Sequence, residues 1–208
     1  MNTTNDRKVR GQNIIDRLLY DDSAAQGRLH DRLAAAAEAE GILDVAYRLV
    51  DTPVGPLLLA ATTQGLGRVA YANEGHDSVL SALARDISPR VMNAPARLDA
   101  AARQIDEYFA GRLMVFDVPL DLRLARGFRR EVLAHLLEIG YGKTATYSWV
   151  AAAAGNAKAV RAAGSACATN PIPVVIPCHR VVRSDGTIGQ YGGGGDIKKA
   201  LLALEASG

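Results

Sequence analysis

The spacing of the apolar residues changes near residue 43, and this change constrains the fold more than any other feature. From Leu43 the stretch DVAYRLV places Val45, Tyr47 and Leu49 on one face, the period of two that is typical of a β-strand. The turn signal DTPVGP follows, and LLLAAT and GRVAYA then predict two more strands around TQGLG. Together these segments predict a small antiparallel sheet.

Helical spacing replaces this pattern further along the chain. Leu98, Ala101, Ile105, Tyr108 and Phe109 mark an amphipathic helix that ends at Gly111, and VFDVPLDL follows as a further extended segment. A second helix has one apolar face, made of Phe128, Val132, Leu133, Leu136 and Leu137. We therefore predict an α/β (α+β) fold, in which a small antiparallel-sheet domain with a helix precedes a mainly helical C-terminal domain.

The first 42 residues are polar, charged and rich in alanine. Ile14, Ile15, Leu18 and Leu19 share one helical face that Leu29 and Leu33 continue, and AAAAEAEG favours helix until Gly41. We expect a helical extension here, either a surface helix or a frayed tail. The expected domains are residues 1–42, an α/β domain over 43–121 and a C-terminal domain over 122–208.

The C-terminal part contains two short helices joined by a Gly-Asn turn. GYGK interrupts the preceding helix, TYSWVAAAAGN predicts a helix that stops at Gly155, and Asn156 can cap the next helix, AKAVRAAGSACA. The second helix carries Lys158 and Arg161, so the pair fits a helix-turn-helix.

The charge is distributed unevenly between the two ends of the chain. Residues 121–208 hold 11 lysines and arginines against 6 aspartates and glutamates, whereas the first 120 residues hold 13 against 16. A basic C-terminal part indicates an acidic partner such as nucleic acid.

Composition excludes several classes of protein. No apolar stretch approaches the roughly 20 residues of a membrane helix, and the polar start MNTTNDRKVRGQ has no signal-peptide core behind it. We therefore expect a cytoplasmic protein. Two cysteines make no disulfide framework, and the four scattered histidines lack ligand spacing near a cysteine pair, so no metal site is expected.

The segment IPCHRVV places Cys178 beside His179 and Arg180, behind the apolar run PIPVVIP. A neighbouring cation lowers the pKa of a thiol, and the thiolate is the nucleophile. Adjacent residues on an extended chain point to opposite faces, however, so the residues alone leave both a reactive thiol and a buried structural cysteine open. Cys167, on the second short helix, is expected to be a small buried side chain.

NPIPVVIPCHRVV closely resembles the active-site segment of the O6-alkylguanine-DNA alkyltransferases, the methylated-DNA–protein-cysteine methyltransferases. The resemblance continues through RSDGTIGQYGGG and KKALLALE, and upstream it includes YGKTATYSWVAAAAGN and AKAVRAAGSACATN. TPVGPLLLAAT and LDAAARQIDEYFAGR look like the N-terminal, ribonuclease H-like domain of that family. The resemblance therefore covers about Val45 to Glu205.

The resemblance implies direct reversal of DNA damage, with irreversible transfer of an alkyl group from O6-alkylguanine, and from O4-alkylthymine, to Cys178 after base flipping. His179 would take the thiol proton through a water, and Glu205 would hold the imidazole. Tyr147 would protonate the departing guanine, and Asn170 would tie the active-site turn to the helix-turn-helix. The partner would be double-stranded DNA, the protein a monomer, and no cofactor would be needed.

The same resemblance assigns two further sets of residues. Arg161 would enter the base stack in place of the flipped base. DNA contacts would come from Arg161, Lys158, Ala159, Thr146 and Tyr147. The base pocket would be lined by Val181, Tyr191, Gly192 and Lys198.

Three positions depart from the family pattern, and two other functions stay open. Gly140 replaces a proline, Trp149 a small or acidic residue, and Gly195 a leucine. One alternative is a non-enzymatic binder of alkylated bases, although relatives of that kind replace the cysteine. The other is a helix-turn-helix regulator with a thiol sensor, for which only residues 1–42 could supply a dimer face or effector domain.

Overall fold

The computed structural model describes residues 24–207, which form two units that divide between Leu43 and Asp44. In the first unit, residues 24–39 are helical, and the chain turns at Gly41 with a φ of 66°. The predicted stop at this glycine is therefore present. Leu29 and Leu33 are more than half exposed, and the predicted face of Ile14, Ile15, Leu18 and Leu19 lies outside the described residues.

The second unit begins with a four-stranded sheet in the order β3-β2-β1-β4. β1 (Val45–Val50), β2 (Leu57–Thr62) and β3 (Gly65–Tyr71) are antiparallel neighbours, which confirms the meander read from the sequence. The short β4 (Val91–Asn93) pairs with β1 in parallel, so the sheet is mixed rather than purely antiparallel. Leu49 is 53% exposed whereas Val45, on the same predicted face, is 1% exposed, so burial does not follow the alternation along the whole strand.

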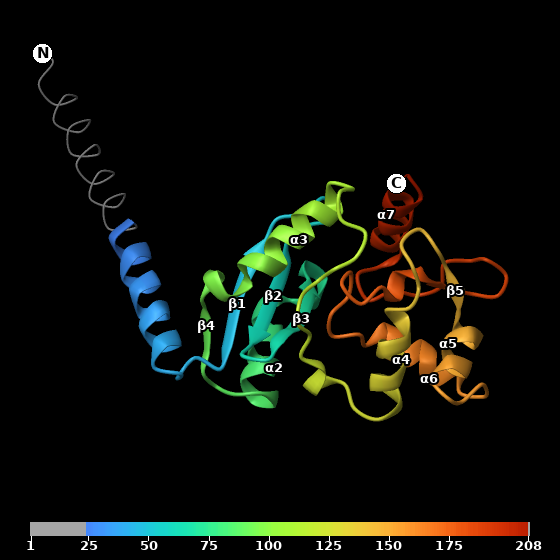
Figure 1. Cartoon of the computed structure of the whole chain (residues 1–208), viewed down its shortest axis with the longest axis horizontal. Coiled ribbons are helices and arrows are strands. Elements are labelled where there is room, and N and C mark those ends of the chain that lie inside the picture. The colour runs from blue at the N-terminus through green and yellow to red at the C-terminus, as the bar shows by residue number, and fades with distance from the viewer. Residues whose placement is uncertain (1–23, 208) are drawn as a thin grey trace, which may run out of the picture. The chain divides into compact units, whose positions relative to one another are not determined.

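Both faces of this sheet are covered, since side chains of a strand point alternately to the two faces and all six residues of β2 are buried. α2 (His76–Asp86) packs Val79 and Leu83 against Leu58 and Ala60, and α3 (Asp99–Phe109) crosses the sheet in Figure 1. α3 buries Ala101, Ala102, Ile105 and Tyr108, which confirms the predicted amphipathic helix. The sequence pattern does not predict α2, because only two of its eleven residues are buried.

The C-terminal part consists of four helices and a two-stranded pairing. The helices are α4 (Phe128–Leu136), α5 (Tyr147–Ala153), α6 (Val160–Ala168) and α7 (Gly195–Ala206), and β5 (Ala145–Thr146) pairs in parallel with β6 (Val181–Val182). α4 buries Val132, Leu133 and Leu136, whereas Leu137 lies beyond it and is 49% exposed.

The turn between α5 and α6 differs from the prediction. α6 begins at Val160, with Ala159 as its N-cap, so Asn156 does not cap it. Instead the Asn156 Oδ1 atom accepts a hydrogen bond from the Lys158 amide (3.2 Å) within the turn. Lys158 therefore lies before the second helix and Arg161 lies within it.

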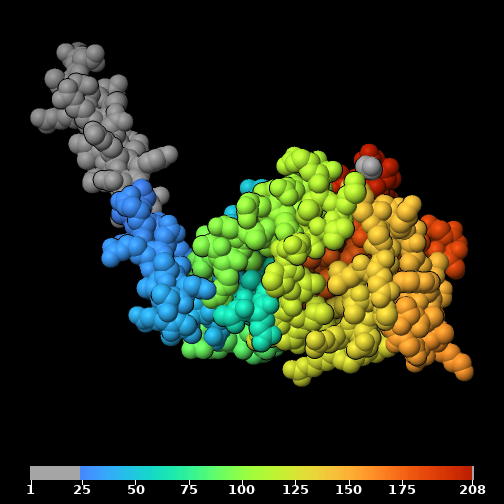
Figure 2. Space-filling model, in the orientation of Figure 1, coloured from blue at the N-terminus to red at the C-terminus, as the bar shows by residue number. Residues whose placement is uncertain are grey.

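The segment between α3 and α4 ties the sheet to the C-terminal helices. VFDVPLDL forms a single bridge, between Leu66 and Leu120, rather than a strand. The amide of Leu66 donates to the Pro119 carbonyl (2.8 Å), and the Asp121 amide donates to the Leu66 carbonyl (2.9 Å). Figure 2 shows this segment as yellow-green surface between the green atoms of the sheet region and the orange atoms of the helices.

Gly65 permits the close approach of this segment to β3. Its φ is +140°, and a Cβ atom there would lie 2.3 Å from the Pro119 carbonyl oxygen. We expect Gly65→Ala to lower the free energy of unfolding by about 2–4 kcal/mol, because both the backbone and the contact would be strained. Denaturant titration measures this difference.

Gly67→Ala is the matched control in the same strand, since its new Cβ atom would meet nothing closer than 3.6 Å. Equal losses of stability in the two variants would show that the approach of Pro119 does not require glycine.

Candidate active site

The thiol of Cys178 lies in a buried turn between α6 and η4 (Cys178–Arg180). Residues 171–181 are all buried, and Cys178 is 3% exposed. The Asn170 side-chain amide donates to the Cys178 Sγ atom (3.1 Å) and to the Ile176 carbonyl (2.8 Å), while its Oδ1 atom accepts from the Ile172 amide (3.0 Å). One asparagine therefore fixes the turn and orients the thiol.

His179 is fully buried beside this thiol and is held by Glu205 of α7. The His179 Nε2 atom lies 2.8 Å from the Glu205 Oε1 atom. Because an ionised carboxylate only accepts hydrogen bonds, we assign the ring hydrogen to Nε2, which leaves a lone pair on Nδ1. Within the described part of the chain, Nδ1 has no hydrogen-bond partner and can accept a proton.

Glu205 accepts hydrogen bonds from four residues, which lie in three parts of the chain. Besides His179, the Arg180 guanidinium donates to both carboxylate oxygens (2.9 Å each), the Tyr108 hydroxyl donates to Oε1 (2.8 Å), and the Gly142 amide donates to Oε2 (3.2 Å). Burial raises the pKa of Glu205, but the hydrogen bonds from His179 and Arg180 outweigh it and lower this pKa to about 2. Glu205 is therefore ionised at neutral pH.

The thiol and the imidazole are both neutral in the resting site. Burial raises the pKa of Cys178 to about 11, against the hydrogen bond from Asn170 and the charge of Lys198. Burial also lowers the pKa of His179, although Glu205 opposes this change. The adjacent Arg180 does not lower the pKa of the thiol, because burial dominates and Arg180 is bound to Glu205 and the Ile139 carbonyl.

Three more predicted residues meet beside the thiol. Lys198 of α7 is fully buried, and its Nζ atom donates to the Val181 carbonyl (2.6 Å) and lies 6.0 Å from the centre of the Tyr147 ring. Burial lowers the pKa of Lys198 and raises that of Tyr147. The Tyr147 hydroxyl therefore keeps its proton at neutral pH and can donate it.

The glycine-rich loop before α7 is fastened to the sheet. The hydroxyl groups of Tyr191 and Tyr71 lie 2.8 Å apart, and the Asn73 side-chain amide donates to the Gly192 carbonyl (3.2 Å). A Cβ atom at Gly193 would lie 2.8 Å from the Tyr71 ring, so glycine is required there. Gly195 is the first residue of α7, which makes the loop shorter than the run of four glycines indicates.

The residues predicted to contact DNA lie on and around α5 and α6. Thr146 caps α5, with its Oγ1 atom accepting from the Trp149 amide (3.2 Å), and Arg161 is exposed on α6. Lys158 is exposed in the turn, and Ala159 is the N-cap of α6. The ring of Tyr147 packs beside Gly164 of α6, where a Cβ atom would lie 3.9 Å from it.

Sequence reasoning missed several residues that hold the site together. Arg180 and Tyr108 both bind Glu205, while Tyr71 and Asn73 hold the loop. Tyr108 did carry a signal, because a tyrosine on an otherwise apolar helix face needs a partner for its hydroxyl once it is buried.

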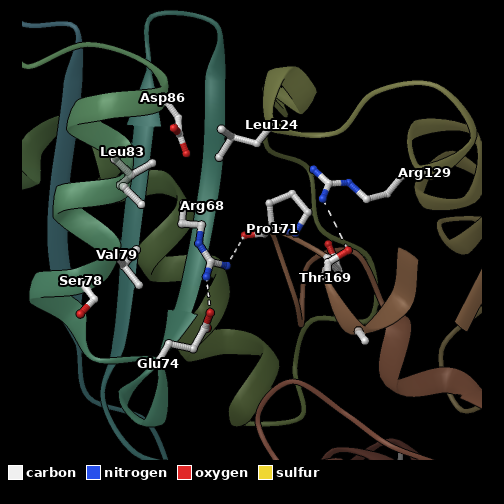
Figure 3. A pocket seen from close by; sticks show the side chains of 13 residues that line it. Arg68, Glu74, Ser78, Val79, Leu83, Asp86, Leu124, Arg129, Thr169 and Pro171 are labelled. Carbon is white, nitrogen blue, oxygen red and sulfur yellow. Dashed lines mark hydrogen bonds and ion pairs between the residues drawn. The ribbon is translucent and has the colours of Figure 1, made fainter. Parts of the chain in front are cut away.

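A cavity of about 490 Å³ lies between the sheet and the end of α6 (Figure 3). On one side Arg68 of β3 forms an ion pair with Glu74 and donates to the Pro171 carbonyl (3.0 Å). On the other, Arg129 donates to the Thr169 hydroxyl (3.5 Å). Asn170 is part of the wall, so these contacts support the turn that carries the thiol.

Residues 24–207 contain neither a candidate metal site nor a candidate membrane-spanning helix. No group of three histidine, cysteine, aspartate or glutamate side chains in this range could hold a metal ion. No helix in the same range combines the length and the apolar character needed to cross a membrane.

Comparison with protein families gives two adjacent matches. Residues 45–122 match the model described as 6-O-methylguanine DNA methyltransferase, ribonuclease-like domain. Residues 127–207 match the model of the DNA binding domain of the same methyltransferase.

Relatives and solved structures agree with these matches. The methylated-DNA–protein-cysteine methyltransferase of Mycobacterium bovis is 40% identical over 161 residues, which are 77% of this chain and 92% of the relative. The crystal structure of Mycobacterium tuberculosis O6-methylguanine methyltransferase has a TM-score of 0.69 and 38% identity, covering 78% of this chain and 93% of that one. A structure of the M. tuberculosis protein in complex with DNA has a TM-score of 0.68, with the same identity and coverage.

The lowered pKa of Glu205 makes the free energy of unfolding depend on pH. The carboxyl titrates near 4.5 when unfolded and near 2 when folded, so it contributes about 3 kcal/mol to the free energy of unfolding above pH 4.5. This contribution is lost as the pH falls from 4.5 towards 2. We expect Glu205→Gln to have a lower free energy of unfolding than the unchanged protein at pH 7. The difference between the two free energies should narrow as the pH falls from 4.5 towards 2.

Asp196→Asn is the control, because Asp196 is a fully exposed carboxylate on the same helix. Denaturant titrations at several pH values measure all three proteins. A Glu205→Gln difference that stays constant from pH 7 to pH 3 would contradict the assignment.

Proposed function

Because the chain belongs to the 6-O-methylguanine DNA methyltransferase family, we propose that it repairs DNA by moving the alkyl group of O6-alkylguanine onto Cys178. The observation that carries the proposal is the buried line of groups from the Cys178 thiol through the His179 imidazole to the Glu205 carboxylate. A nucleophile, a base and a group that orients the base are the parts that this transfer needs.

The transfer is a displacement at the alkyl carbon. The thiol proton passes through a water to Nδ1 of His179, and Glu205 stabilises the imidazolium that forms. The sulfur then forms a bond to the alkyl carbon while the bond from that carbon to the guanine O6 atom breaks. The product is a thioether on Cys178, which no group in the site can reverse, so each molecule acts once.

The departing guanine takes the electron pair of the broken bond. Tyr147 donates its phenolic proton to the base, so that guanine leaves as a neutral molecule, and the proton lost by the thiol restores the phenol through His179 and solvent. Val181, Tyr191, Gly192 and Lys198 surround the base. The Lys198 ammonium beside the Tyr147 ring stabilises the phenolate that forms briefly.

The lesion reaches the thiol only as an extrahelical base. Cys178 is 3% exposed, and a guanine stacked in a duplex is too large and too constrained to reach a buried sulfur. α5 and α6 bind double-stranded DNA as a helix-turn-helix, with contacts from Thr146, Lys158 and Ala159. Arg161, exposed on α6, occupies the space that the flipped base leaves.

The same pocket accepts O4-alkylthymine, in which the alkyl group is also attached to an exocyclic oxygen. The protein acts as a monomer in the cytoplasm, without a cofactor.

Replacing the acceptor tests the proposal directly. We expect Cys178→Ser to abolish transfer and to leave DNA binding nearly unchanged, because binding depends on α5 and α6. Cys167→Ser is the matched control, since Cys167 is also buried and burial raises its pKa to about 12. Mass spectrometry after incubation with O6-methylguanine DNA should show one added CH₂ unit on Cys178 in the unchanged protein and in Cys167→Ser.

Two results would reject the proposal. If Cys167 in Cys178→Ser were alkylated at the rate of the unchanged protein, Cys178 would not be the alkyl acceptor. DNA binding without any mass increase in the unchanged protein would favour a non-enzymatic binder or a regulator.

Arg161→Ala tests base flipping. We expect it to slow repair of duplex DNA by roughly tenfold or more, because extrusion of a base costs a few kcal/mol, while reaction with free O6-benzylguanine changes little. Lys158→Ala, which removes a nearby charge outside the helix, should weaken binding to duplex DNA more than it slows the step after binding. Single-turnover rates at saturating protein measure the step after binding in both variants, and titration with duplex DNA measures their binding. Equal losses on duplex and free base in Arg161→Ala would show that Arg161 has another role.

A further inference from the structure

Tyr108 brings the N-terminal part of the chain into contact with the catalytic groups. It lies on α3, 97 residues before Glu205, and is fully buried. Its hydroxyl donates to the Glu205 Oε1 atom (2.8 Å) and lies 3.4 Å from the His179 Nε2 atom. The oxygen that holds the imidazole therefore accepts hydrogen bonds from Tyr108 and from the Arg180 Nη2 atom (2.9 Å) as well as from His179.

We propose that Tyr108 is a positioning residue for the alkyl transfer: its hydroxyl shares Oε1 of Glu205 with His179 and so keeps the imidazole in the neutral form that accepts the thiol proton. The inference rests on the proposed function and deepens it, because it gives the sheet domain a part in the chemistry. The hydrogen bonds of the Tyr108 hydroxyl go to Glu205 and His179, so it acts through these two residues.

The effect depends on how many hydrogen bonds the Oε1 atom of Glu205 accepts. A carboxylate oxygen that accepts two hydrogen bonds attracts the proton of an imidazolium more strongly than an oxygen that accepts three. The Tyr108 hydroxyl thus weakens the pull of Glu205 on a protonated His179. It also restricts the movement of the carboxylate, which in turn fixes the direction of Nδ1.

The other groups that face His179 act differently from a neutral hydroxyl. Arg180 and Lys198 are cations whose charge opposes protonation of the imidazole, Arg180 from the neighbouring position, where it also donates to both oxygens of Glu205, and Lys198 from α7. The Tyr191 ring meets His179 edge-on with 6.5 Å between centres, and its hydroxyl is bound to Tyr71. Cys178 supplies the proton itself. Only Tyr108, among the described neighbours, donates a neutral hydrogen bond to Oε1 from outside the C-terminal part.

The ring of Tyr108 has a separate role in packing. Its centre lies 5.3 Å from that of Phe109, 5.4 Å from that of Phe116 and 6.2 Å from that of Tyr141. Tyr108→Phe preserves these contacts and removes only the hydroxyl. Tyr141→Phe is the matched control, because its hydroxyl is directed to the Leu204 carbonyl (3.5 Å) and not to the carboxylate.

The test is an NMR titration of the His179 imidazole in the full chain, assigned by comparison with His179→Gln. We expect the midpoint to rise by roughly 0.5–1 pH unit in Tyr108→Phe and to stay unchanged in Tyr141→Phe. In the pH profile of the transfer rate, the midpoint of the rise on the acid side should move in the same direction. The maximum rate, on the plateau of that profile, should fall roughly three- to tenfold in Tyr108→Phe.

A second substitution keeps the test decisive if Tyr108→Phe does not fold. Site-specific 3-fluorotyrosine at position 108 retains the hydroxyl and makes it a stronger donor, so the midpoint should fall. Equal midpoints in all these proteins, or the same rise in Tyr141→Phe, would overturn the role of Tyr108. Failure of alkyl transfer in the unchanged protein would instead reject the proposed function, since the titration requires no substrate.

Discussion

The carboxylate of Glu205 is the group on which the rest of this structure depends. A buried negative charge is very unfavourable unless charged and polar partners surround it. Here the partners come from η4, α3 and the turn at Gly142, so the carboxylate is satisfied only when these segments meet α7. Folding and assembly of the catalytic groups are therefore the same event.

Local sequence patterns were sufficient for most of the secondary structure. The apolar spacing of α3 and α4 is strong, since each helix buries one continuous face, and the alternation from Val45 predicts a strand although Leu49 is exposed. The patterns failed where few residues are buried or where pairing is distant. α2 buries only Val79 and Leu83, and the parallel position of β4 depends on contacts with β1 that no local signal records.

The site could be predicted only in part, and the reason is physical. Asn170, Cys178 and His179 lie within ten residues, so their proximity follows from the chain itself, and the resemblance added Glu205 and Tyr147. The structure brings these groups together. Tyr108 and Tyr71 come from the sheet domain, and their hydroxyl groups act at points more than 90 residues away in sequence. Such contacts leave no periodic signal. The sequence also left the charge state of Cys178 open, because burial is a property of the whole fold.

The contacts of the glycine-rich loop before α7 show that the N-terminal and C-terminal regions of this molecule are not independent modules. Two separate sequence regions meet at one site, because β3 supplies the Tyr71 hydroxyl to Tyr191, and Asn73, just after β3, supplies a side-chain amide to the Gly192 carbonyl. A fragment limited to the C-terminal region would lose both hydrogen bonds and would uncover the surface on which Gly193 packs. Recombination between relatives therefore has to exchange both regions, or match them at the tyrosine pair, for the loop to keep its shape. Evolution of either region is constrained by the other, even though each has its own hydrophobic residues and its own secondary structure.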